Sequence, residues 1–245
     1  MAHAVQLGHL AHVVSLYRQV GLRGERGTST GAVEGLEEAV GRPLPGAYRE
    51  FMLWAGHGAG DLLRGSRCFF HDIGAIQGAA HDVLEEGGCE EEMPLEPIVF
   101  WMHQGYQFLF FTLDAGDDPP LHYYNSADGM TEIAWGFYPS ISEFLAREVI
   151  GHAQLAQEIT GRRSGVDRIV DRHVPVHPRE HDAERKLVDQ IRAQYGGEDG
   201  QVYPHVRGEV KLVSDQPVCI SCQWHIARLQ RMYPNLRLIV KSVQQ

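Results

Sequence analysis

Residues 217–242 read PVCISCQWHIARLQRMYPNLRLIVKS, and this stretch decides the fold expected for the last third of the chain. Its first half predicts a helix, because Ile226 and Leu229 recur at helical spacing, and its second half, NLRLIVKS, predicts a strand. Upstream, EVKLV at 209–213 predicts another strand, and DAERKLVDQIRAQYG at 182–196 predicts an amphipathic helix. The order helix, strand, helix, strand predicts a small α/β domain of right-handed arrangement.

Two cysteines, Cys219 and Cys222, stand three residues apart at the start of the expected second helix. Backbone N–H groups and the dipole at a helix N-terminus stabilise thiolates, which are zinc ligands. Zinc deaminases use H-x-E followed by P-C-x-x-C, and the glutamate moves protons without binding the metal. The expected first helix opens with D-A-E at 182–184, so Asp182 replaces the histidine, and Pro217 lies two residues before Cys219.

This combination resembles the zinc-dependent nucleic acid and nucleotide deaminases of bacterial polymorphic toxin systems, over residues 170–245. The positions that match their pattern are Asp182, Glu184, Lys186, Leu187, Cys219, Ser221, Cys222, Tyr233, Pro234 and Asn235. The resemblance implies a cytidine-deaminase-like domain at 166–245 that binds Zn²⁺ and hydrolytically deaminates a nucleobase, with cytosine in nucleic acid or a nucleotide as the expected substrate. It further implies Asp182, Cys219 and Cys222 as metal ligands, with His181 as the alternative to Asp182, and Glu184 as the proton shuttle.

The same residues allow other interpretations, which stay open at this point. The C-x-x-C pair could be a thiol–disulfide redox pair, or part of a structural zinc site that includes His225. Asp182 could serve only as a helix N-cap, and Glu184 only as a first-turn acid favoured by the helix dipole. A chain with lapsed catalysis would instead be an immunity or scaffold protein.

Motifs of a different kind occupy residues 30–150. They are E-x-x-x-G-x-x-L-P at 37–45, Y-R-E-F at 48–51, W-A-G-H-G-A-G at 54–60, aromatic strands holding Trp101, Phe108 and Phe110, and S-I-S-E-F-L at 140–145. This pattern resembles the SUKH superfamily, an α+β fold of bacterial toxin-immunity proteins. The resemblance implies a SUKH-like binding domain at 1–160 with a protein partner, followed by the α/β deaminase-like domain.

Periodicity and turn residues predict the elements of this first domain. Helices are expected at 9–20, 32–40, 45–55 and 140–149, the last with Ser140 or Ser142 as its cap. Strands are expected on both sides of Gln104-Gly105 within 98–112, at 121–125 and at 133–135, with a turn at Asp128-Gly129.

Charge separates the two regions. The net charge is −10, but residues 1–165 hold 10 Lys and Arg against 22 Asp and Glu, whereas residues 166–245 hold 12 against 10. An acidic module of charge −12 followed by a module of charge +2 indicates two units with different partners, joined by a linker near 161–165.

Composition excludes several classes of protein. We see neither an apolar run long enough for a membrane helix nor a secretion signal, so we expect no membrane partner and a cytoplasmic location, with signal-independent export left open. Four cysteines in 245 residues do not indicate a disulfide scaffold. Cys68 and Cys89 are interpreted as ordinary thiols.

Overall fold

The computed structural model describes residues 7–89, 93–127, 132–161, 183–198, 201–214 and 217–242. The chain divides into two compact units, residues 1–150 and 151–245, and each hydrophobic cluster of the core lies within one of them. The turn predicted at Asp128-Gly129, residues 162–165 of the predicted linker, His181 and Asp182 lie outside the described residues.

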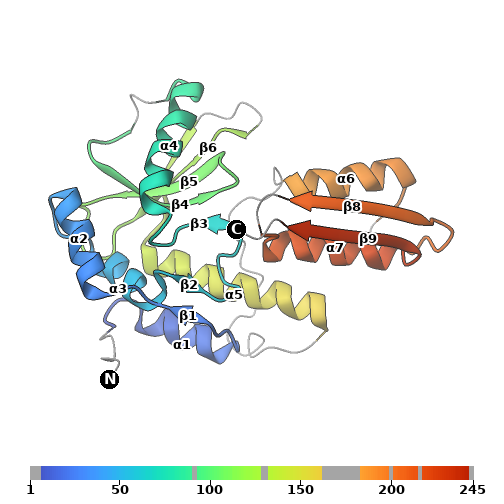
Figure 1. Ribbon diagram of the computed structural model, residues 1–245, viewed down its shortest axis with the longest axis horizontal. Coiled ribbons are helices and arrows are strands. Elements are labelled where there is room, and N and C mark those ends of the chain that lie inside the picture. The colour runs from blue at the N-terminus through green and yellow to red at the C-terminus, as the bar shows by residue number, and fades with distance from the viewer. Residues whose placement is uncertain are drawn as a thin grey trace. The chain divides into compact units, whose positions relative to one another are not determined.

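The first unit is a mixed α/β domain (Figure 1). Its helices are α1 (Ala11–Gln19), α2 (Thr30–Val40), α3 (Gly46–Ala55), α4 (Ile73–Gly87) and α5 (Ile141–Thr160), the last of which continues into the second unit. Its strands are β1 (Glu25–Arg26), β2 (Gly58–Ala59), β3 (Ser66–Arg67), β4 (Pro97–His103), β5 (Gln107–Thr112), β6 (Leu121–Asn125) and β7 (Glu132–Tyr138).

A five-stranded antiparallel sheet in the order β3-β4-β5-β6-β7 forms the centre of this unit. Successive side chains of a strand point to opposite faces, so each strand contributes to two layers. Trp101 and Leu109 belong to the larger core, together with residues of α1, α3 and α5. Met102 and Phe108 belong to a second core with residues of α4. The sheet is therefore covered by helices on both faces (Figure 1).

The E-x-x-x-G-x-x-L-P motif is the junction between α2 and α3. Gly41 ends α2 in the left-handed conformation, at φ +77°, which glycine adopts without steric cost. The Glu37 carboxylate accepts hydrogen bonds from the Leu44 backbone N–H at 3.1 Å and from the Arg49 guanidinium at 2.5 Å. Pro45 is the N-cap of α3. The motif thus fixes the angle at which α3 enters the core.

Two predicted elements run further than expected, whereas the helix α4 and the short strands β1, β2 and β3 were not predicted. The helix predicted at 140–149 continues to Thr160, because Ala153 and Leu155 keep burying apolar surface. The division between the units therefore falls inside α5, before the boundary expected at 160. The strand predicted at 133–135 extends to Tyr138, past Gly136 at φ +64°, where the alternation of side chains is interrupted.

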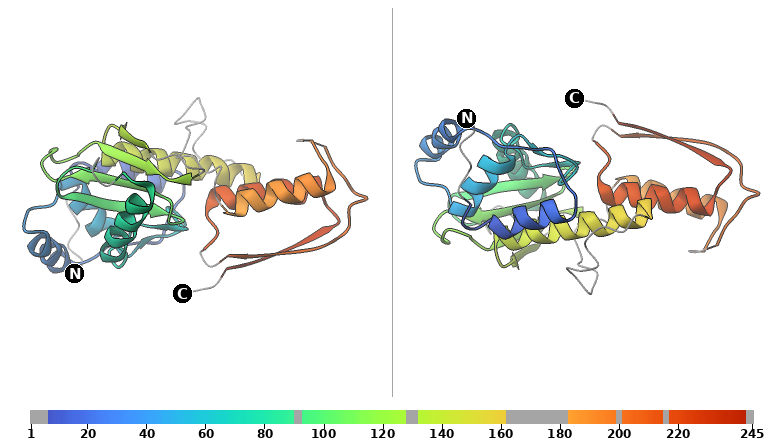
Figure 2. Two further views of the ribbon diagram at one scale, coloured as in Figure 1. Left: turned by 90° about the horizontal axis from the view of Figure 1, so that it is seen from above. Right: turned by 90° about the horizontal axis from the view of Figure 1, so that it is seen from below.

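The second unit contains α6 (Ala183–Tyr195), β8 (Gly208–Ser214), α7 (Ile220–Met232) and β9 (Leu236–Ser242), in the predicted order. β8 and β9 pair in parallel, and both helices lie side by side on one face of this pair (Figure 2). A single hydrophobic cluster joins the four elements, with Val188, Ile191, Leu212, Leu229 and Leu236 buried in it. The parallel pairing is the result expected when a helix connects two strands of one sheet, as in a β-α-β unit.

Contacts at both ends show that α6 and α7 run in the same direction. Near their starts, the Arg185 guanidinium lies 2.8 Å from Nε2 of His225. At their ends, the Tyr233 hydroxyl donates a hydrogen bond to the Gly196 carbonyl, and the Tyr195 and Tyr233 rings lie 6.2 Å apart. The N-termini of both helices therefore lie at the same end of the unit.

Candidate metal centre

The cysteine pair forms the N-terminus of α7, as predicted. Cys219 is the N-cap residue, and its sulfur accepts a hydrogen bond from the Cys222 backbone N–H at 3.4 Å. Both side chains are buried beside Val218 and Ile226, and they are not joined in a disulfide. The Gln223 side chain, which donates to the Val218 carbonyl at 2.9 Å, ties the approaching loop to the helix. Two sulfur atoms at a helix N-terminus are a donor set suited to zinc.

The predicted proton shuttle lies at the corresponding position of the neighbouring helix. α6 begins at Ala183, which places the backbone of Glu184 in its first turn. Because α6 and α7 begin at the same end of the unit, this backbone lies at the end that carries the cysteine pair. The structure describes neither the side chain of Glu184 nor the residues His181 and Asp182. The role of Glu184 as proton shuttle and those of Asp182 or His181 as metal ligand therefore stay predictions.

His225 has a different environment from that of a metal ligand. Its Nε2 and Nδ1 atoms lie 2.8 and 3.3 Å from the Arg185 guanidinium. Because a guanidinium group can only donate, the His225 imidazole is neutral and accepts the hydrogen bond. Burial and the positive charges of Arg185 and Arg228 lower the pKa of His225 to about 4. Arg185 also donates to Asp189 at 2.9 Å within α6. No spacing rule indicates a contact between residues 40 positions apart, so a role for Arg185 could not be predicted from the sequence.

A third ligand for a metal ion bound by Cys219 and Cys222 would have to come from a side chain that the structure does not describe. Within the described ranges, no His, Cys, Asp or Glu completes a group of three with Cys219 and Cys222, and this holds for His225 as well. The structural zinc site with His225 therefore gains no support. Asp182 and His181, which the sequence analysis proposed as ligands, lie immediately before α6 in the chain.

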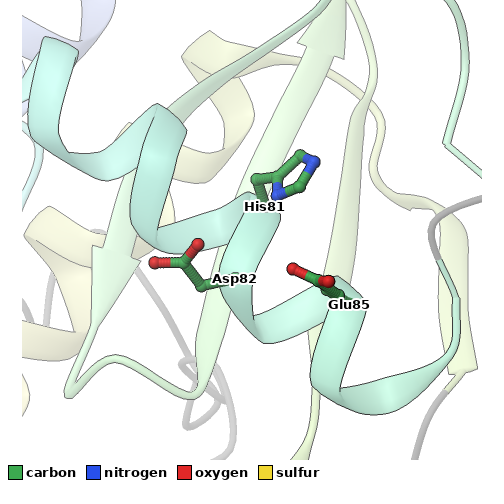
Figure 3. Close-up of side chains that lie close together, drawn as sticks. All are labelled: His81, Asp82 and Glu85. Atoms are coloured by element: carbon green, nitrogen blue, oxygen red, sulfur yellow. The ribbon is translucent and has the colours of Figure 1, made fainter.

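One group of three potential ligands does occur in the described residues, in the first unit. His81, Asp82 and Glu85 project from α4, and their ligand atoms lie within 4.8 Å of one another (Figure 3). All three residues are exposed, and exposed acidic groups on a helix surface are ordinarily solvated. Nothing else in the described structure converges on them, so we assign them no metal.

Comparisons with known proteins bear on the first unit. No curated protein matched the chain. Residues 27–147 match the model of the SMI1 / KNR4 family (SUKH-1), a range that contains the Glu37 junction and the sheet of the first unit. No helix in the part of the chain that the structure describes is long and apolar enough to span a membrane.

Because residues 27–147 match this family model, the N-terminal part of the chain is a SUKH domain of the SMI1 / KNR4 type.

Proposed function

We propose that the second unit is a zinc-dependent hydrolytic deaminase of nucleobases, joined to a SUKH domain that binds a protein partner. The expected substrate is cytosine in nucleic acid or in a nucleotide. SUKH domains are protein-interaction modules of immunity proteins, and the match over residues 27–147 suggests a toxin-immunity setting. The deaminase part of the proposal depends on residues of the second unit alone.

The observation that carries this proposal is the common direction of α6 and α7. It brings the helix turn that bears Glu184 and the helix start that bears Cys219 and Cys222 to one end of the unit. A deaminase needs these groups together, because the metal ligands and the proton-transferring carboxylate act on the same substrate atoms. In sequence the two motifs lie more than 30 residues apart.

Each residue has a defined part in the proposed reaction, in which cytosine and water yield uracil and ammonia. Cys219, Cys222 and Asp182, or His181 in its place, would hold Zn²⁺, which supplies Lewis acidity when bound. Glu184 takes a proton from the attacking water and delivers it to the ring nitrogen, and a second proton transfer releases the amine. The burial of both thiols keeps competing oxidants and solvent away from the sulfurs.

The rival interpretation is a binding protein in which the second unit no longer catalyses. It is favoured by the SUKH domain, since this is the part that matches a known family and its role is protein interaction. A thiol–disulfide enzyme is the third interpretation, and it assigns no role to Glu184.

The proposal is tested by incubating the full chain with single- and double-stranded DNA and RNA and with cytidine nucleotides. We expect uracil formation by the wild-type protein and none by Glu184→Gln, which removes the proton carrier but leaves the thiols in place. Zinc content is measured on the same samples and should be unchanged in Glu184→Gln. Bound zinc without uracil from any substrate would favour the binding protein, and full activity of Glu184→Gln would refute the mechanism.

A further inference from the structure

The outer face of α7 carries an aromatic and basic stripe that the proposed mechanism does not use. Trp224, Arg228 and Arg231 recur at intervals of four and three residues, so they lie on one side of the helix. Cys222 and Leu229 lie on the buried side. The guanidinium carbon of Arg228 lies 4.4 Å from the centre of the Trp224 ring, in a cation–π contact.

The charge of this part of the chain is of one sign. From Pro217 to Ser242 the sequence holds Arg228, Arg231, Arg237 and Lys241 and no Asp or Glu. Within α7 the two arginines are the charged residues, and both belong to the stripe. A helix segment whose charged side chains are all basic favours contact with polyanions.

A cleft of ≈ 550 Å³ within the second unit is lined by Trp224, Arg228, Arg231 and Met232, with Val202 and Glu158 at its other walls. Trp224 is partly exposed, and Val202 is 61% exposed. The Trp224 indole N–H donates to the Glu158 carboxylate at 2.6 Å, and the Arg231 guanidinium lies 3.5 Å from the Glu158 carbonyl oxygen. The carboxylate of Glu158, an anionic group of the chain itself, therefore lies on this face.

We propose that the Trp224–Arg228–Arg231 face binds single-stranded nucleic acid and leads it to the cysteine-bearing end of the unit. The inference rests on the proposed function and names the form of its substrate. An indole can stack on any base, and two guanidinium groups can pair with consecutive phosphates. Trp224 lies two residues after Cys222, which is about 3 Å along the helix axis but on the opposite side of α7. A strand stacked on Trp224 would thus lie at the end of α7 that carries the cysteines, and a neighbouring nucleotide would reach the proposed centre around the N-terminus of the helix.

The test measures binding of fluorescein-labelled dT and rU 20-mers to the full chain by fluorescence anisotropy. These probes contain no cytosine, so turnover does not affect the result. Trp224→Ala should weaken binding by at least about fivefold, the loss typical of one stacked base, whereas Trp224→Phe should retain most of it. Arg228→Gln and Arg231→Gln should each reduce the salt dependence by about 0.7 in slope. Glu158→Gln should tighten binding, because it removes the competing carboxylate.

Trp135→Ala is the matched control, because Trp135 is 54% exposed and belongs to the other unit. Equal effects of Trp224→Ala and Trp135→Ala, or no binding of either probe, would overturn the inference. So would self-association that only Trp224→Ala abolishes, since this would make the face a contact between copies. Deamination of cytidine nucleotides without binding of the 20-mers would refute the surface but leave the proposed function intact. Binding that needs Trp224, without uracil from any substrate, would refute the function alone.

Discussion

Glu37 allows the junction between α2 and α3 to be tested quantitatively. Its carboxylate accepts hydrogen bonds from the Leu44 backbone N–H and the Arg49 guanidinium, at 3.1 and 2.5 Å. Glu37→Gln keeps an oxygen that can accept from Leu44, but it removes the negative charge opposite Arg49. Glu37→Ala removes both interactions. The two variants therefore separate the ion pair from the backbone hydrogen bond.

The expected losses of stability follow from how far the Glu37–Arg49 ion pair is exposed to solvent. The side chains of Arg49 and Glu37 are 33% and 18% exposed, so the ion pair is partly screened by solvent. We expect Glu37→Gln to lower the free energy of unfolding of the first unit by about 1 kcal/mol. Glu37→Ala should lower it by about 2 kcal/mol, because the Leu44 N–H loses its acceptor as well.

The pH dependence gives a second check with a defined sign. The hydrogen bond from Arg49, followed by that from Leu44, holds the pKa of Glu37 below its ordinary value of 4.5. A carboxyl group whose pKa is lower in the folded state stabilises the fold above its unfolded pKa. The difference between wild type and Glu37→Gln should thus be constant above about pH 5 and shrink as the pH falls below 4.5.

Urea denaturation followed by tryptophan fluorescence measures these losses, since Trp54 and Trp101 are buried in the first unit. Glu38→Gln is the control, because Glu38 is the exposed neighbour on the same helix. The reasoning is refuted if Glu37→Ala costs no more than Glu38→Gln, or if the loss in Glu37→Gln persists unchanged at pH 3.

Three further predictions concern the second unit. Calorimetry of the full chain should show two unfolding transitions, because each unit has its own hydrophobic clusters; a single transition would contradict this. Leu229→Ala, at a residue 1% exposed, should lower the stability of the second unit by about 2–4 kcal/mol, and Val213→Ala, at a residue 64% exposed, by less than about 0.5 kcal/mol. The His225 ring should titrate near pH 4 in proton NMR spectra, in which its signal is assigned by its absence from His225→Gln. Because the pKa of His225 is lower in the folded state, the second unit should lose stability as the pH falls from 6.5 toward 4. Titration near 6.5 would contradict the described contact with Arg185.

Much of the fold could be predicted because it follows from local periodicity. The apolar spacing of α1, α3, α6 and α7 and the turn at Gln104-Gly105 between β4 and β5 all indicated elements that the structure contains. Gly41 ends α2 as expected, and Ser140 accepts a hydrogen bond from the Glu143 N–H at the start of α5. These signals act within a few residues of one another.

The elements that were not predicted depend on distant partners. β1 and β2 are two residues long and exist because Glu25 and Arg26 pair with Ala59 and Gly58, which no periodicity can indicate. α4 contains three glycines, a composition that disfavours a helix, and it is held by burial of Ile76, Ala80 and Leu84 against the sheet.

At the candidate site, the position of the cysteine pair at a helix N-terminus could be predicted from the sequence, but the contacts around the pair could not. The C-x-x-C spacing and the helix that follows are local, so the position of both thiols at the start of α7 could be predicted and is confirmed. The bond from Arg185 to His225 and the indole contact of Arg228 depend on how α6 and α7 pack and on rotamers, which spacing does not define.

The central claim, a zinc centre built on Cys219 and Cys222, is tested most directly by X-ray absorption at the zinc edge of the purified full chain. We predict about one zinc per chain with two sulfur ligands at roughly 2.3 Å and lighter ligands at roughly 2.0–2.1 Å. Folded protein without zinc, or zinc with no sulfur in its first shell, would contradict the account.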